Sequence, residues 1–196
     1  MTDLYQGRDP RDIPTWFFCT NPCIMLGLNR YITKLLPHNP LWLMYAQVQC
    51  NELKQTLEDQ AIDVQHVGST AVPDLPAKPI IDIAVGLQDE ADVSEAITRL
   101  GNMSYLYRGD TGESGGYLFV KETSPDIRSI HLHAVDYDGR QWRNYLLFRD
   151  TLRQDTVLRQ QYANLKQSLA RRFLHDREQY TNSKHAFIQS VLNRDD

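Results

Sequence analysis

The amino-acid sequence predicts an α+β fold in which a mixed α/β sheet is followed by a C-terminal helical subdomain. Apolar β-rich runs alternate with helical patterns through roughly the first two thirds of the chain, and the rest is helical throughout. One β-rich run is apolar on both faces, which indicates a strand inside a sheet. We expect an N-terminal extension at 1–35, a core at 36–137 and helices packed on that core at 138–196.

Elements in the first half follow from periodicity and turn residues. Asn39-Pro40 favours a helix start, because Asn caps a first turn and Pro fits it. Apolar residues then recur at steps of three and four. Gly101 is typical of a helix end. The elements expected here are, in order, a helix around 28–36 in an apolar extension, a helix at 39–60, strands at 62–67 and 79–87, and a helix at 89–100.

Turn residues divide the second half. The segment 109–116 is dense in glycine, which is typical of a flexible loop. Ser124-Pro125-Asp126 predicts a turn between two strands, and Asp155 is placed to cap a helix. The elements expected here are strands at 103–107, 117–122 and 128–135, and helices at 139–153, 155–173 and 176–193.

Composition fits an ordinary globule and argues against two classes of partner. The 196 residues are 41% hydrophobic and 23% charged, and a net charge of −4 does not favour broad nucleic-acid binding. No apolar run approaches the roughly 20 residues that span a bilayer, and the first residues lack a signal pattern. We expect a cytoplasmic protein with a small-molecule partner and neither nucleic acid nor membrane. The oligomeric state stays open.

The three cysteines, Cys19, Cys23 and Cys50, do not indicate a disulfide framework. Cys19 and Cys23 lie in an apolar segment, where packing accounts for them. A metal-binding or redox pair is the alternative, but no second Cys or His pair at zinc spacing accompanies them.

The stretch from His66 to Ile83 carries the strongest functional signal. A β-rich run ends at Gly68-Ser69-Thr70, a loop with three prolines follows, and Asp82 stands among isoleucines on the next β-rich run. Glycine lets a ligand approach the backbone, loop amides hold phosphate oxygens, and a strand acid holds the magnesium that phosphates bring. Lys78 in the loop is placed to neutralise a phosphate.

The same residues also have structural interpretations. A Gly-Ser pair after a strand is often a plain turn, Lys78 could be a solvated loop side chain, and His66 could brace the loop. An ionised Asp82 on an apolar strand is costly unless it is paired or bound to a metal. The alternative to a metal ligand is therefore an acid that caps a turn or meets an arginine.

His131-Leu132-His133 is a second candidate element. Because strand side chains alternate, the two histidines face one way and Leu132 the other. Two such histidines can chelate a metal or flank a reacting group, and structural hydrogen bonding is the alternative. They would lie beside Asp82 if their strand neighbours the Asp82 strand.

Further basic residues are candidates for an anionic ligand. Arg108 stands at the head of the glycine-rich loop, and Arg149 is followed by Asp150, a pair that could instead fix a helix to the sheet. Tyr and Lys four residues apart share a helix face, which suits a base and a phosphate or is simply a solvated face. These pairs are Tyr162 with Lys166 and Tyr180 with Lys184.

The fuller string HVGSTAVPDLPAKPIIDI at 66–83 resembles the GrpB family within the nucleotidyltransferase superfamily, which includes polymerase β. The resemblance extends from about Leu36 to Leu192 and includes HLHAV at 131–135, LLFRDTLR at 146–153 and both Tyr/Lys pairs. It implies a nucleotidyltransferase-like core, with the histidine strand beside the Asp82 strand. A similar domain is fused to some dephospho-coenzyme A kinases, which hints at nucleotide or coenzyme A chemistry.

Two departures from the usual pattern bear on activity. The superfamily usually has two acids at i and i+2 on the strand after the turn, whereas the second place here is Ala84, and a histidine stands where a third acid is expected. A two-metal site needs several carboxylates. Asp74 replaces a glycine usual in the family's loop, and its charge would repel phosphate or help to bind a cation or an amine.

The leading hypothesis is a nucleotidyltransferase-type enzyme that uses ATP or another nucleoside triphosphate with Mg²⁺ and a small-molecule acceptor. The alternatives are a nucleotide- or coenzyme A-binding module without transfer chemistry, and an acyl- or amide-transfer enzyme that uses the same cleft. The residues assigned are Asp82, His131 and His133 to catalysis, Asp82 and His133 to the metal, and Gly68, Ser69, Thr70, Lys78, Arg108, Arg149 and Lys166 to the cosubstrate.

Overall fold

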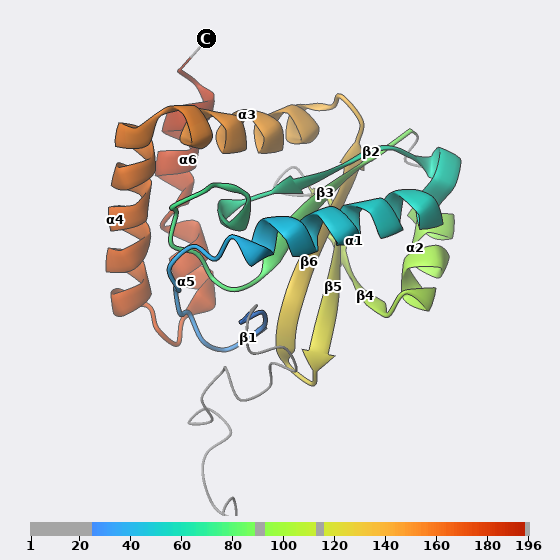
Figure 1. Ribbon diagram of the computed structural model, residues 1–196, viewed down its shortest axis with the longest axis horizontal. Helices are drawn as coiled ribbons and strands as arrows, with labels where there is room; N and C mark the ends of the chain where they lie inside the picture. The colour runs from blue at the N-terminus through green and yellow to red at the C-terminus, as the bar shows by residue number, and fades with distance from the viewer. Residues whose placement is uncertain (1–24, 89–92, 113–115, 195–196) are drawn as a thin grey trace, which may run out of the picture.

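A computed structural model describes residues 25–88, 93–112 and 116–194 and shows an α+β protein, as predicted (Figure 1). Its six-stranded mixed sheet has the order β2-β3-β6-β5-β4, with β1 paired to β6. The β3–β6 pair is parallel and the other pairs are antiparallel. The strands are β1 Leu28–Asn29, β2 Ala61–Val67, β3 Ile81–Leu87, β4 Tyr105–Asp110, β5 Tyr117–Ser124 and β6 Ile127–Asp136.

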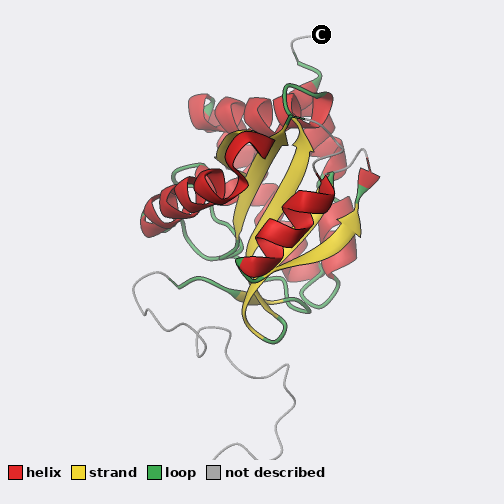
Figure 2. Ribbon diagram, turned by 90° about the vertical axis from the view of Figure 1, so that its right-hand side faces the viewer, coloured by secondary structure: helices red, strands yellow, loops and turns green. Residues whose placement is uncertain are grey.

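Helices lie on both sides of the sheet (Figure 2). In Figure 1, α3 runs along the top, and α4, α5 and α6 stand together at the left. The α-helices are α1 Leu41–Leu57, α2 Val93–Asn102, α3 Arg140–Gln154, α4 Thr156–Arg172, α5 Arg177–Asn182 and α6 His185–Leu192, and two 3-10 turns are η3 Glu58–Gln60 and η4 Ser69–Ala71. Within the described ranges, none of these helices has the length and apolar character needed to cross a bilayer.

The strand predicted to be buried on both faces is β3. Its residues Ile81 and Ile83 pack in the main core, which also contains Trp42 of α1. Ala84 points the opposite way and packs with Trp142 of α3. This second face, between the sheet and α3–α6, is the one that carries Asp82, because strand side chains alternate.

Two predicted elements are wrong. Residues 28–36 do not form a helix, because Leu28 is fully buried and pairs with Arg128 of β6 as part of a short strand. The described part of the extension is thus held by the core, and the Gly27 N–H donates to the Pro79 carbonyl at 2.8 Å. The helix expected at 176–193 is two helices, α5 and α6, separated at Ser183–Lys184.

The other boundaries agree closely with the sequence. The Asp155 carboxylate accepts from the Leu158 N–H at 2.8 Å, which confirms the predicted cap of α4. The helix α2 continues through Gly101 to Asn102. Cys19, Cys23, the first residues of the helix expected from 89 and the middle of the glycine-rich loop lie outside the described residues.

Candidate anion-binding site

The Gly68 turn and Asp82 meet at one end of the sheet. Val67, the last residue of β2, pairs with Asp82 on β3, so the turn begins directly beside the aspartate. Gly68 has φ +68°, and a Cβ there would lie 2.8 Å from the Cβ of Asp82 and closer still to its carboxylate. Only glycine fits this approach. The turn and the aspartate are therefore adjacent, as predicted.

Asp82, His131 and Arg177 form a hydrogen-bonded chain. The parallel pairing of β3 and β6 sets Asp82 opposite His131, and 3.2 Å separates Asp82 Oδ1 from His131 Nδ1. His131 Nε2 lies 3.0 Å from Nη2 of Arg177. A guanidinium can only donate, so Nε2 accepts and Nδ1 carries the proton that it donates to Asp82. His131 is thus a neutral imidazole.

The pKa values of this pair agree with the hydrogen bonding. Burial lowers the pKa of His131 to about 4, although Asp82 favours its protonation. Burial alone would raise the pKa of Asp82, but the hydrogen bond from His131 and the charges nearby, including that of Lys78, lower it to about 2. At neutral pH an ionised carboxylate therefore lies beside a neutral histidine, and 31% of the Asp82 side chain stays exposed.

Lys166 of α4 connects the C-terminal helices to the turn. Its Nζ donates to Ser69 Oγ at 2.9 Å and to the Pro76 carbonyl at 2.6 Å, and it lies 4.8 Å from the centroid of the Tyr162 ring. The side chain is 1% exposed, and this burial holds the pKa of Lys166 well below its usual range. The Tyr162/Lys166 pair therefore faces the interior and not solvent.

Lys78 and Lys184 lie against the ring of Tyr180. Their Nζ atoms are 5.2 and 4.6 Å from its centroid, which is cation–π geometry. Burial lowers the pKa of both lysines, that of Lys184 to about 8. Within the described part of the chain, Asp82 is the carboxylate whose charge stabilises both ammonium groups.

These contacts define a cationic cluster, which consists of Lys78, Lys166, Lys184 and Arg177 around Asp82. All four cations interact electrostatically with the Asp82 carboxylate and with at least one other member. Arg177 and Lys184, with pKa values of about 10 and about 8, are both protonated at neutral pH, and one carboxylate cannot neutralise both. The cluster therefore has an excess of positive charge at low exposure, where an anionic ligand is attracted most strongly.

The sequence comparison assigns the chain to a family. The family described as "GrpB protein" matches residues 33–194, which is most of the chain. The chain belongs to the GrpB family. The order of motifs from the Gly68 turn to Lys184 falls inside the matched range, as the resemblance in the sequence predicted.

Individual relatives show how far the likeness extends. The chain is 33% identical over 172 residues to the "Glutamate-rich protein GrpB" of Alkalihalophilus pseudofirmus, covering 86% of this chain and 99% of that protein. It matches the crystal structure of the conserved protein GrpB from Enterococcus faecalis with a TM-score of 0.73 and 31% identity, covering 81% of this chain and 94% of that one. A dephospho-CoA kinase of Mycobacterium leprae is 27% identical over 82% of this chain and 45% of its own length.

The described residues of the candidate site do not supply the donors of a resident two-metal centre. Among the described residues, no three His, Cys, Asp or Glu side chains gather at metal-binding distance. Ala84, in the place of the second acid, is fully buried in the packing under α3. Asp82 fits only as a single carboxylate for an ion that arrives on a ligand's phosphates, as magnesium commonly does.

His133 lies on the same face of the sheet as Asp82 and His131. It pairs with Ala84 across the β3–β6 ladder, and its ring centroid is 5.3 Å from that of Tyr145 on α3. The predicted arrangement of both histidines on the Asp82 face is thus present. His131 is hydrogen-bonded to Asp82 and Arg177, and His133 follows two residues later on the same strand.

Thr70 and His66 brace the turn from inside. Thr70 is 1% exposed, and its Oγ1 lies 3.0 Å from His66 Nε2 and 3.4 Å from the Ile80 carbonyl. Burial lowers the pKa of His66 to about 4, which leaves it neutral at pH 7. These contacts agree with the interpretation that His66 braces the loop, and Thr70 also contacts its own loop through the Ile80 carbonyl.

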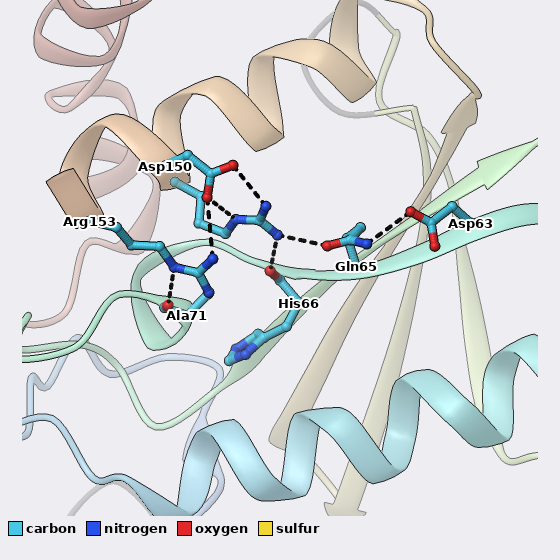
Figure 3. A network of polar contacts seen from close by, with 7 residues as sticks. Asp63, Gln65, His66, Ala71, Asp150 and Arg153 are labelled. Carbon is cyan, nitrogen blue, oxygen red and sulfur yellow. Dashed lines mark hydrogen bonds and ion pairs between the residues drawn. The ribbon is translucent and has the colours of Figure 1, made fainter.

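The structure does not bring Arg149 and Arg108 into the cationic cluster. Arg149 of α3 donates to Gln65 Oε1 at 2.9 Å, to the His66 carbonyl at 3.0 Å and to both carboxylate oxygens of Asp150 (Figure 3). It therefore fixes α3 to β2, which is the structural alternative considered for it. Arg108 lies on β4, at the opposite edge of the sheet from β2, with its Nη2 3.5 Å from Glu122.

Arg177 is the functional candidate that sequence reasoning missed. It follows the break between α4 and α5, and no motif surrounds it. Its place beside His131 depends on how α5 packs on the sheet. The sequence indicated Lys184 only as a residue that shares a helix face with Tyr180. Tyr180 is 1% exposed, so this face points inward.

Proposed function

We propose that this member of the GrpB family binds a nucleoside triphosphate over the Gly68-Ser69 turn and transfers its nucleotidyl group to a small-molecule acceptor. The observation that carries the proposal is the convergence of the turn, Asp82 and the cationic cluster on one place. Coenzyme A also contains a nucleotide, so a nucleotide-binding site agrees with the similarity to a dephospho-CoA kinase.

The cationic cluster would hold the phosphates. Lys78 and Lys184 are held against Tyr180, so the ring orders two otherwise flexible side chains before a ligand arrives. Lys166 bonds to Ser69 and so holds the turn in place. Cations fixed in a site of low exposure stabilise the charge that develops on phosphoryl oxygens during transfer.

In the proposed reaction an acceptor hydroxyl or amine attacks the α-phosphorus of the triphosphate. A bond forms between the acceptor atom and the α-phosphorus, and the bond to the bridging oxygen breaks, so that pyrophosphate leaves with the electron pair. The acceptor proton passes to the imidazole of His133, which faces the same side of the sheet as Asp82. A magnesium ion bound to the triphosphate would belong to the substrate, with Asp82 as its one protein carboxylate.

The test is pyrophosphate release from labelled ATP in a screen of small acceptors. We expect Asp82→Asn and Lys184→Met each to lower the rate by about 100-fold or more. Arg143→Gln is the control, because the Arg143 side chain is 64% exposed on α3 and pairs with Asp138. Turnover that is unchanged in Asp82→Asn would contradict the proposal.

Ala84 favours a second candidate function, which is binding of a nucleotide or coenzyme A without transfer. A site with one carboxylate keeps its affinity for phosphates and lacks the ligands of the superfamily's two-metal chemistry. Calorimetry would then show nucleotide or coenzyme A binding that a metal chelator does not change, and no acceptor would release pyrophosphate. Chelator-sensitive release of pyrophosphate would exclude this candidate.

A further inference from the structure

A β-bulge in β6 turns Arg128 toward the candidate site. Lys121 of β5 pairs with Ile130, but the next residue, Glu122, pairs with Arg128, so Ser129 is the extra residue. Residues that pair directly share a face of the sheet, and Glu122 shares the face of Val120 and its partner His131. In a regular strand Arg128 and His131 would point to opposite faces, whereas the bulge gives them the same one.

Arg128 and Arg177 each have a buried nitrogen without a hydrogen-bond partner among the described residues. In Arg128 this atom is Nε, which lies 3.9 Å from Glu122 Oε1, too far for a hydrogen bond. In Arg177 it is Nη1, while Nη2 donates to His131. A buried donor without an acceptor is costly, so two of them on neighbouring arginines indicate an acceptor that the described part of the chain does not supply.

The charges around the two arginines indicate an anion. Burial and the positive charges of Arg128 and Arg30 lower the pKa of Arg177 to about 10, and Asp82 is the described acid that opposes them. Burial and the charges of Arg30 and Arg108 lower the pKa of Arg128. Glu122 and Asp126 offset this in part, but Glu122 also lies 3.5 Å from Arg108, and Asp126 lies 3.7 Å from Arg30.

We infer that Arg128 and Arg177 form a second anion subsite, which binds a carboxylate or phosphate group of the acceptor. The inference rests on the proposed function, because it needs the triphosphate to occupy the lysines of the cationic cluster. Arg177 links the two subsites: one of its nitrogens bonds to His131 and the other faces the second anion. The acceptor is therefore an acidic small molecule whose anionic group lies next to the Asp82–His131 pair.

The test measures the binding of small anions to the full chain in the presence of saturating ATP. Malonate probes carboxylates and inorganic phosphate probes phosphates, each by calorimetry on wild type, Arg128→Gln and Arg128→Lys. The matched control is Arg30→Gln, which removes the same charge nearby from a side chain that is 37% exposed. Thermal unfolding of each variant shows that it is folded.

We expect Arg128→Gln to weaken binding of the preferred anion about tenfold or more, because a buried charge-assisted hydrogen bond is lost. Arg128→Lys keeps the charge without the planar fork and should fall between Arg128→Gln and wild type. ATP affinity should change less than about twofold in either variant. The anion that binds more tightly identifies the acceptor group as a carboxylate or a phosphate.

Three results would overturn the subsite. They are the absence of malonate and phosphate binding to wild type, equal weakening by Arg30→Gln, and a loss of ATP affinity in Arg128→Gln as large as that in Lys184→Met. Should ATP fail to bind while Arg128→Gln still abolishes binding of an anion, the subsite stands and the proposed nucleotidyl transfer fails.

Discussion

At the scale of single residues, Asp82 is an acidic side chain on an apolar strand whose ionisation depends on the charges around it. It stands on a strand whose other residues are apolar, yet 31% of its side chain is exposed, and the absence of a Cβ at Gly68 leaves room for its carboxylate. Its carboxylate is hydrogen-bonded to His131 and lies among four cations, so the ionised form is favoured despite partial burial. The acid therefore stabilises the lysines and arginine that surround it.

The pH dependence of stability should reveal this role. The pKa of Asp82 is about 2 in the folded protein, below the value near 4 of an unfolded chain, so its contribution is present above pH 4 and is lost as the pH falls toward 2. We expect Asp82→Asn to lower the free energy of unfolding at pH 7 by about 1–2 kcal/mol. Urea denaturation from pH 7 to 2.5 should show this difference shrinking below pH 4, and a difference independent of pH would contradict it.

At the scale of elements, α3 and the β2–β3 loop are fixed to each other by arginines. Arg149 ties α3 to the end of β2, and Arg153 of the same helix donates to the Ala71 carbonyl at 3.0 Å (Figure 3). Val72 and Leu75 of the loop pack with Leu152 and Tyr162. The turn that would hold phosphate is therefore positioned by helices that come much later in the sequence.

Arg149→Lys should separate structure from ligand binding. Lysine keeps the charge but cannot donate hydrogen bonds to Gln65, the His66 carbonyl and Asp150 at the same time. We therefore expect the free energy of unfolding to fall by about 2–4 kcal/mol. Nucleotide affinity of the folded variant should change less than about threefold. Urea denaturation and calorimetry measure the two effects, with the exposed Arg143→Lys on the same helix as control. A large loss of affinity with normal stability would place Arg149 in the ligand site.

Local patterns predicted the part of the site that lies on neighbouring strands. The Gly68 turn and Asp82 come together because a β-hairpin-like pairing of β2 and β3 sets Val67 opposite Asp82. The side shared by His131 and His133 follows from strand alternation alone. Strand order is not visible in such patterns, and the resemblance to the GrpB family supplied it.

Other parts depend on tertiary packing and could not be predicted locally. The orientation of Arg128 depends on one extra residue at Ser129, and that of Arg177 on a break between helices. Residues 28–36 were predicted as a helix because their apolar residues give no sign that Leu28 pairs with a strand about 100 residues later. A bulge, a helix break and a distant pairing each arise from contacts that periodicity does not record.

The whole molecule assembles one site from two parts of the chain. The sheet supplies Asp82 and the histidines, and α4–α6 with the β2–β3 loop supply the lysines and Arg177. Burial lowers the pKa of Lys78, Lys166 and Lys184, that of Lys184 to about 8, and an anion bound beside these lysines would raise their pKa values.

Ligand binding should therefore take up protons. An added anion raises the lowered lysine pKa values, so we expect proton uptake on ATP binding between pH 7 and 9, and affinity that falls as the pH rises through about 8, the pKa of Lys184. Calorimetry in buffers of different ionisation enthalpy measures the uptake. Lys184→Met should reduce it, and binding without net proton uptake in wild type would contradict the prediction.

Lys166 bonds to both Ser69 Oγ and the Pro76 carbonyl, and so connects the two ends of a proline-stiffened loop to α4 in the absence of any ligand. The conformational entropy of this loop is consequently lost when the chain folds and not when it meets its ligand. Association should then follow single-exponential kinetics without a slow isomerisation step, and the amides of Ala71 and Val72, which donate to the Gly68 and Ser69 carbonyls, should resist hydrogen exchange in the ligand-free protein.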